Sequence, residues 1–296
     1  MKTLRLTLTC ILLTFIAALP AMAGPRTFVS GLGNDANPGT REQPKRTFAS
    51  ALSVTDPGGE IVALDSAGFA STALTINKSV SIIAPPGVYA GVRVASGNGI
   101  AVNAGASDKV ILRGLSINGT GTYGINFSSG AALHVESCVI NGFYSGGGGT
   151  GGIYSNSTGK LFVNDTIIRG GDSGIIVNQG QVSLDQVRME DNIVGLNAYA
   201  GKTSARNSVA SGNGYGFVAQ GGGSTEVNIE NCLAANNISA GVFIDLGTVR
   251  VSNCTVTDNA RGLVNQFGLL ESRGNNTVRG NTSGNTSGTI TVIPGI

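Results

Sequence analysis

The chain has 296 residues, of which 46 are Gly, none is Trp and only 12% are charged, a composition that argues against helical bundles and coiled coils. Hydrophobic residues make up 41% of the sequence, which is enough apolar surface to form a core and argues against disorder. The formal net charge is only +2, so the chain does not have the basic character of a nucleic-acid-binding protein.

Residues 1–23 have the features of a cleavable signal peptide. Lys2 and Arg5 precede an apolar run over residues 6–19, and small residues then predict cleavage before Gly24. The run is shorter than the roughly 20 residues that span a bilayer, which disfavours a membrane anchor. We therefore expect a secreted or periplasmic protein without membrane insertion. Removal of the peptide leaves 17 basic against 17 acidic residues, a balance that disfavours nucleic acid as a partner.

Residues 24–56 are expected to form an N-terminal segment with one short helix. Pro44 precedes residues 46–52, in which Phe48 and Leu52 lie one helical turn apart. We expect this amphipathic helix to cover the open N-terminal end of the fold that follows.

Residues 57–296 contain an internal repeat with intervals of 21 to 28 residues. One register is a Gly followed by alternating apolar positions, and it occurs at Gly99, Gly124, Gly152, Gly174, Gly195, Gly216, Gly241 and Gly262. A second register of strand centres keeps step with the first, at Leu112, Val135, Val163, Leu184, Ala205, Ile229, Val251 and Ser272. Both registers lengthen together around Gly146 and Gly149, which predicts an insertion there.

The repeating segments are short, alternating and rich in β-branched residues, which predicts strands. A strand this short cannot bury a face alone, but successive turns stacked at about 4.8 Å form one continuous core. The sequence therefore predicts an all-β fold, a parallel β-helix that is right-handed because parallel crossovers almost always are. Two inward columns are expected, one with Ile125, Ile153 and Ile175 and the other with Ile140 and Ile168.

A polar signal accompanies the repeat. Asn192, Asn213, Asn237 and Asn259 recur just before successive Gly-containing strands. Asn tolerates left-handed backbone and forms local hydrogen bonds, so a turn with stacked Asn side chains is expected at these positions.

Residues 26–40 read RTFVSGLGNDANPGT and residues 44–52 read PKRTFASAL; GEIVALDSAGF follows at 59–69 and LTINKSVSI at 74–82. This stretch resembles the opening of bacterial secreted right-handed parallel β-helix proteins in the pectate-lyase-like superfamily, and the resemblance extends over 24–296. It implies the fold. Lyases, hydrolases, adhesins and phage tailspikes share that fold, so function has to be argued from a site.

The acidic residues offer one cluster, Asp172 with Glu190 and Asp191 on the next turn, close to Arg169 and Arg188. A metal or catalytic role there competes with a simpler interpretation. In that interpretation Arg169 and Glu190 form an exposed ion pair across neighbouring strands.

The single His and the cysteines favour structural roles. His134 occupies an outward position, and a catalytic His needs a nucleophile or substrate group within hydrogen-bond reach. Cys138, Cys232 and Cys254 each follow a strand centre by three residues, so they should point inward as small apolar thiols. A disulfide between the last two is compatible with an exported protein. No cofactor and no metal are expected.

An outward row has unusually little charge, and it is formed by the third residue of each Gly strand: Ala101, Asn126, Tyr154, Ile176, Asn197, Val218, Phe243 and Val264. A row of this kind, if exposed, suggests a contact surface. The predicted ligand-binding residues are Tyr154 and Phe243, which could stack on sugar rings, and Asn126 and Asn197, which could bond sugar hydroxyls. Two alternatives stay open: the inserted loop near Gly146 covers the row, or the row mediates self-association.

These observations favour a secreted β-helix that binds an extended polymer, with polysaccharide the preferred class and no recognisable catalytic set. The alternatives are a polysaccharide lyase or hydrolase of the pectate-lyase-like type, and a structural protein of the cell envelope or surface.

Overall fold

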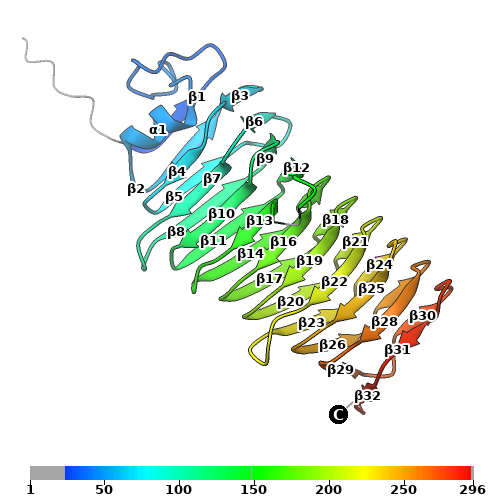
Figure 1. Cartoon of the computed structure of the whole chain (residues 1–296). Coiled ribbons are helices and arrows are strands. Elements are labelled where there is room, and N and C mark those ends of the chain that lie inside the picture. Colours follow the sequence, from blue (N-terminus) through cyan, green and yellow to red (C-terminus); the bar gives the residue numbers. More distant parts are fainter. Residues whose placement is uncertain (1–23, 148, 295–296) are drawn as a thin grey trace, which may run out of the picture.

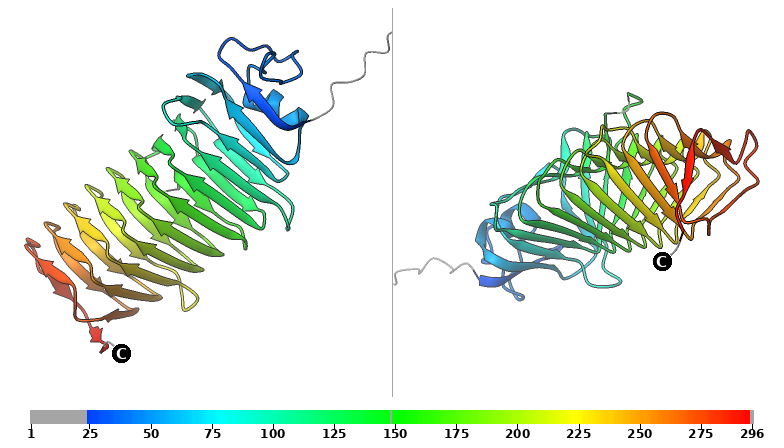
Figure 2. Two further views of the ribbon diagram at one scale, coloured as in Figure 1. Left: turned by 180° about the vertical axis from the view of Figure 1, so that it is seen from behind. Right: turned by 90° about the horizontal axis from the view of Figure 1, so that it is seen from below.

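The computed structural model describes residues 24–147 and 149–294. They form an elongated right-handed parallel β-solenoid with a short helix at its N-terminal end (Figure 1). Each turn of the coil contributes one strand to each of three parallel sheets, and the view from below shows the successive turns wrapping around a common interior (Figure 2, right). The segment interpreted as a signal peptide, residues 1–23, lies outside the described residues.

The three sheets, which we name A, B and C, account for every strand. Sheet A consists of β1 (Gly24–Val29), β2 (Thr55–Ala63), β5 (Val80–Ile83), β8 (Lys109–Arg113), β11 (Ala132–Glu136), β14 (Lys160–Asn164), β17 (Gln181–Asp185), β20 (Lys202–Arg206), β23 (Glu226–Glu230), β26 (Thr248–Ser252), β29 (Leu269–Ser272) and β32 (Ile290–Val292). Sheet B consists of β3 (Ala67–Ala70), β6 (Ala90–Val94), β9 (Leu115–Gly119), β12 (Val139–Gly142), β15 (Ile167–Arg169), β18 (Arg188–Glu190), β21 (Val209–Ser211), β24 (Leu233–Ala235), β27 (Thr255–Thr257) and β30 (Thr277–Arg279). Sheet C consists of β4 (Leu74–Ile76), β7 (Asn98–Asn103), β10 (Tyr123–Ser129), β13 (Gly151–Ser155), β16 (Ser173–Val177), β19 (Val194–Ala198), β22 (Tyr215–Ala219), β25 (Ala240–Ile244), β28 (Arg261–Asn265) and β31 (Thr286–Ser287).

The predicted core columns are confirmed. In sheet C, Ile125 pairs with Ile153, which pairs with Ile175, and all three side chains are fully buried. In sheet B, Ile140 pairs with Ile168, and both are buried. Because each of these side chains lies directly above its counterpart in the next turn, the turns of the described coil share one continuous apolar core.

The Asn turn is also confirmed, with one difference. The side chains of Asn192, Asn213 and Asn237 are buried and hydrogen-bonded in a column, each Nδ2 donating to Oδ1 of the next, over 3.2 Å in both cases. The expectation that Asn itself takes the left-handed backbone is wrong here. The residue before it has the positive φ, as in Asp191 (φ 53°) and Gly212 (φ 69°), because the Asn must leave the bend with its amide pointing inward.

Both ends of the coil are covered. Helix α1 (Phe48–Val54) begins two residues later than predicted, and Thr47 caps it by accepting a hydrogen bond from the Ser50 amide. Phe48 and Leu52 are buried, so the helix closes the N-terminal end as expected. β1 pairs with β2, which makes the N-terminal segment continuous with sheet A. At the other end β32 pairs with β29.

The inward cysteines are confirmed as buried, and Cys138, Cys232 and Cys254 are all free thiols. The Cys232 amide donates to Cys254 Sγ over 3.4 Å, so the two residues are neighbours without a disulfide. Within residues 24–147 and 149–294, no helix has both the length and the apolar character needed to cross a membrane.

Candidate functional site

The outward row on sheet C exists as the sequence predicts. Asn126 pairs with Tyr154, and further along the sheet Asn197 and Phe243 each pair with Val218. These residues therefore stand in one column along the outside of the coil.

The row is less exposed than expected. Five of its eight members are buried, and the expectation of an exposed apolar row is wrong for Ala101, Ile176, Asn197, Val218 and Val264. Side chains from the neighbouring columns lie against them, a packing that the repeat alone does not reveal. Asn126, Tyr154 and Phe243 are half-buried and remain accessible.

Both polar atoms of the Asn197 side chain are hydrogen-bonded to neighbouring side chains. Its Nδ2 donates to the hydroxyl of Tyr199 over 3.2 Å, and its Oδ1 accepts a hydrogen bond from Gln220 Nε2 over 2.5 Å. The amide of Asn197 therefore orients Tyr199, which is 40% exposed, and does not itself face solvent.

Tyr154 is part of an aromatic pair that the sequence did not reveal. Its ring stacks on Tyr123 with 4.5 Å between the centroids and 11° between the planes. Tyr123 pairs in register with Gly151, three residues before Tyr154 on the same strand. The pKa of Tyr123 is raised, mainly because the side chain is partly buried and to a smaller extent because Tyr154 and Tyr199 lie nearby. Its hydroxyl is thus neutral at physiological pH and can donate a hydrogen bond.

A second aromatic pair lies further along sheet C. Tyr215 and Phe243 meet edge to face with their centroids 5.3 Å apart. They line a surface hollow of about 310 Å³ together with Ile238 and the guanidinium-bearing side chain of Arg261. An aromatic wall with one charged donor is a common arrangement in pockets that bind small ligands.

A third feature adjoins this hollow at the turn between sheets B and C. Tyr144, which is 59% exposed, and the exposed Ile193 and Ile238 surround a floor that includes Gly212 and Gly214, in a hollow of about 380 Å³. Ile238 lines both hollows, so the two are adjacent. The floor is open because glycines stand where other turns carry larger residues.

Asp172 organises the inserted loop and is not part of an acidic site. Its carboxylate accepts hydrogen bonds from the Ser145 hydroxyl (2.6 Å), the Thr150 hydroxyl (2.8 Å) and the Gly146 amide (3.0 Å). Burial raises the pKa of Asp172, but the hydrogen bonds from Ser145 and Thr150 together lower it by more. The pKa of Asp172 is therefore below its ordinary value. The charged carboxylate therefore ties the loop to the coil.

The predicted pair between Arg169 and Glu190 is wrong. The two residues are neighbours in register, but Arg169 donates to Asn141 Oδ1 over 2.7 Å, and Glu190 pairs with Arg188 of its own strand. Among the described residues, no three His, Cys, Asp or Glu side chains gather in a way that could hold a metal ion.

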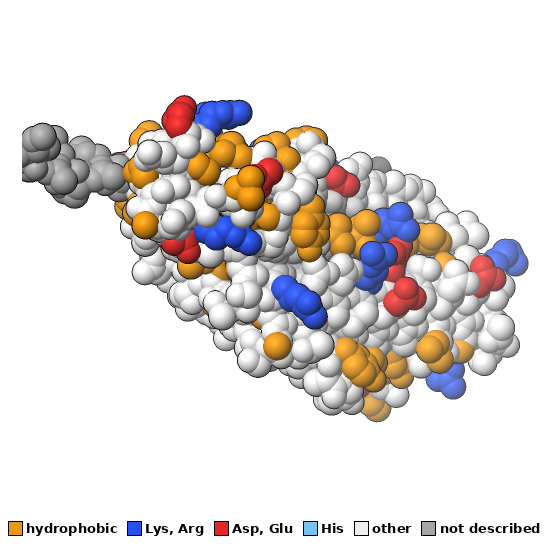
Figure 3. Space-filling model, turned by 90° about the horizontal axis from the view of Figure 1, so that it is seen from above, with side chains coloured by type: hydrophobic (Ala, Val, Ile, Leu, Met, Phe, Trp, Pro, Cys, Tyr) orange, Lys and Arg blue, Asp and Glu red, His pale blue; other side chains and the backbone are white. Residues whose placement is uncertain are grey.

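Opposite charges on adjacent turns of sheet A form ion pairs. Arg113 and Glu136 pair at 2.6 Å on adjacent turns, and Asp185 pairs with Arg206 at 2.8 Å. The face of the molecule shown in Figure 3 is mostly uncharged, and its basic and acidic side chains are scattered without a continuous basic area. His134 stacks on Phe162 with 4.7 Å between centroids, and burial lowers its pKa, so the imidazole is neutral at pH 7.

The comparisons with known proteins agree with the fold. The family model described as "Right handed beta helix region" matches residues 88–227 and 147–283, so the chain belongs to the right-handed β-helix family. Pectate lyase Pel9A is similar in structure, with a TM-score of 0.63 and 16% identity over 92% of this chain and 78% of that chain. A rhamnogalacturonan lyase (TM-score 0.46, 14% identity, 90% and 84% covered) and the GH136 lacto-N-biosidase from Eubacterium ramulus (0.45, 11%, 90% and 68%) are more distant. At these identities the similarity shows the fold alone. No match was found among curated proteins.

Proposed function

We propose that the protein is exported and binds an extended polysaccharide along the outer face of sheet C. The observation that carries this proposal is the presence of two aromatic pairs, Tyr123 with Tyr154 and Tyr215 with Phe243, on one face of one sheet. Four strand spacings separate Tyr154 from Phe243, which at about 4.8 Å each is roughly 19 Å. That separation exceeds one sugar ring and suits an extended ligand.

The chemistry of the face fits a sugar polymer. Aromatic rings present flat apolar surfaces on which the C–H faces of sugar rings can pack. Asn126 accepts a hydrogen bond from Ser128 through Oδ1, and its Nδ2 has no partner within the described part of the chain, so it can donate to a sugar hydroxyl. The similarity of fold to a pectate lyase favours polysaccharide as the class of ligand.

The test is a glycan array followed by calorimetric titration of the best ligand. Tyr154→Ala removes one stacking partner, and we expect binding about tenfold weaker, equal to about 1.4 kcal/mol. Tyr89→Ala is the matched control, because Tyr89 is 52% exposed but lies next to sheet B. Absence of binding to every glycan would favour a structural role in the envelope. Equal losses for the two variants would contradict the assignment of the site.

Cleavage of the polymer is the second candidate, and the similarity to pectate lyase Pel9A is the observation that favours it. Arg261 is the basic side chain beside the Phe243 hollow. Incubation with uronate polymers and Ca²⁺ should then raise the absorbance of unsaturated products in the wild type and not in Arg261→Ala. A flat trace for the wild type would reject the lyase activity.

A further inference from the structure

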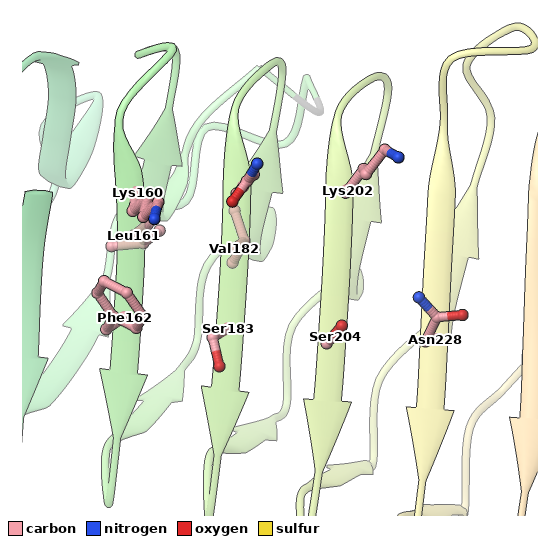
Figure 4. Close-up of a pocket in the computed structure, with 9 residues that line it drawn as sticks. Lys160, Leu161, Phe162, Val182, Ser183, Lys202, Ser204 and Asn228 are labelled. Atoms are coloured by element: carbon pink, nitrogen blue, oxygen red, sulfur yellow. The ribbon is translucent and has the colours of Figure 1, made fainter. Parts of the chain in front are cut away.

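Sheet A carries a separate hollow that the proposed function does not use. It has a volume of about 350 Å³ and crosses β14, β17, β20 and β23 (Figure 4). Its axis follows one outward column in which Phe162, Ser183, Ser204 and Asn228 are paired in register from strand to strand. Because Ser183 and Ser204 are small and lie between the larger Phe162 and Asn228, the surface is depressed at the middle of this column.

The end of the hollow at β14 is aromatic. Phe162 stacks on His134 of the preceding turn at an angle of 16°, so one face of its ring is covered. The other face of the Phe162 ring is directed toward β17, where the residue paired with Phe162 is the small Ser183 (Figure 4). The wall is thus a flat apolar surface beside two hydroxyls and, on β23, the amide of Asn228.

One rim of the hollow is positively charged. The neighbouring outward column consists of Lys160 on β14, Gln181 on β17 and Lys202 on β20. Lys202 Nζ lies 3.6 Å from Glu226, which also pairs with Arg250 at 3.4 Å. Lys160 has no ion-pair partner among the described residues. The outward column on the opposite side does not line the hollow: Asp185 and Arg206 pair with each other there, and Glu230 on β23 has no ion-pair partner among the described residues.

We infer that this hollow binds a sugar residue that carries one anionic group, either a carboxylate or a sulfate. Phe162 packs against the ring, Ser183 and Ser204 pair with its hydroxyls, and Lys160 pairs with the anion. A lysine ammonium is suited to this role because it is a mobile point charge with three donors. The hollow lies on a different sheet from the two aromatic pairs, so the protein has two independent saccharide-binding faces.

The matched control is provided by the repeat itself. Lys109 stands in the same column as Lys160, two strands away, and does not line the hollow. Lys160→Met should weaken binding of an acidic oligosaccharide at least tenfold, whereas Lys109→Met should leave it within twofold. Ser183→Leu should fill the hollow and abolish binding. These side chains are exposed or border solvent, so the variants should retain their thermal midpoints.

The titrations are best made in a Tyr154→Ala, Phe243→Ala background, which removes the sheet C platform and isolates the hollow. Three trisaccharide probes are compared: one of hexuronic acid, its carboxyl-reduced neutral counterpart and a sulfated neutral counterpart. Binding of the uronic or the sulfated probe, at least tenfold tighter than the neutral one and weaker in high salt, would support the inference and identify the anion. Equal binding of all three probes, or equal effects of the two lysine variants, would overturn it. Loss of glycan binding through Ser183→Leu but not through Tyr154→Ala would refute the sheet C proposal and leave this one standing.

Discussion

Asn213 donates a hydrogen bond from Nδ2 to Oδ1 of Asn237 over 3.2 Å, although 24 residues separate them in the sequence. Asn213 Oδ1 in turn accepts from both the backbone amide (3.0 Å) and Nδ2 (3.2 Å) of Asn192, and Asn213 Nδ2 also reaches Met189 O (3.0 Å). Each Asn of the column thus joins three consecutive turns inside the coil. The stability of a turn depends on that of its neighbours.

Asn213→Leu should therefore be strongly destabilising. The substitution keeps the volume but removes all four side-chain hydrogen bonds of Asn213, and it leaves the buried backbone amide of Asn192 without its Oδ1 acceptor. An unsatisfied buried group costs about 1–3 kcal/mol. We expect the free energy of unfolding to fall by about 3 kcal/mol or more, measured by urea denaturation with circular dichroism. Asn281→Leu is the control, because Asn281 ends the column in a partly exposed position where water can replace it. Equal losses for the two variants would contradict this account.

Affinity for the sheet C ligand should depend on ligand length. If Tyr154 and Phe243 contact one chain, an oligosaccharide shorter than their separation of roughly 19 Å can reach only one of them. Phe243→Ala should then weaken binding of long oligosaccharides about tenfold, while short ones that occupy the Tyr154 end keep their affinity. Calorimetry over a series of lengths measures this. An effect of Phe243→Ala that is independent of length would show that the two aromatic pairs act separately.

The loop residues that Asp172 holds, Ser145, Gly146 and Thr150, should become less protected in acid. The pKa of Asp172 is lowered in the folded protein, so its carboxylate stabilises the loop above the ordinary Asp pKa of about 3.9 and loses this contribution as the pH falls toward the lowered value. We expect hydrogen exchange at Ser145 and Gly146 to show less protection at pH 3 than at pH 6. Asp172→Asn should lose protection at both pH values, whereas Asp191→Asn, on the exposed turn, should behave like the wild type. Unchanged protection of the wild type at pH 3 would contradict the role of this carboxylate.

The three buried cysteines should be unreactive in the folded protein. Burial raises the pKa of Cys138 to about 11, and the neighbouring Cys254 thiol together with burial raises that of Cys232. Little thiolate of Cys138 and Cys232 is therefore present at pH 8. The hydrogen bond with Cys232 lowers the pKa of Cys254, so the low reactivity expected of Cys254 rests on its burial. For protein that begins at Gly24 and so lacks Cys10, Ellman's reagent should detect almost no thiol in the native state and three thiols after unfolding without reductant. Detection of a single thiol after unfolding would indicate a disulfide between Cys232 and Cys254.

The sequence by itself determined the coil. Because the same class of residue returns at the same place in every turn, Ile125, Ile153 and Ile175 could be placed in one inward column, and the Asn column could be placed at one turn. The burial of Cys138 followed from the same periodicity, whereas the capping helix followed from the spacing of Phe48 and Leu52 by one helical turn.

Only the tertiary structure decided which outward residues remain accessible. Periodicity specifies the direction of a Cα–Cβ bond, but exposure depends on how side chains of neighbouring columns and turns lean over it. Asn197 was predicted to meet a ligand and is instead buried and hydrogen-bonded to Tyr199 and Gln220. Tyr123 was not predicted to take part, yet its ring stacks on that of Tyr154. The hollow beside Phe162 arises likewise from two small side chains on adjacent strands, a juxtaposition that exists only once the turns are stacked.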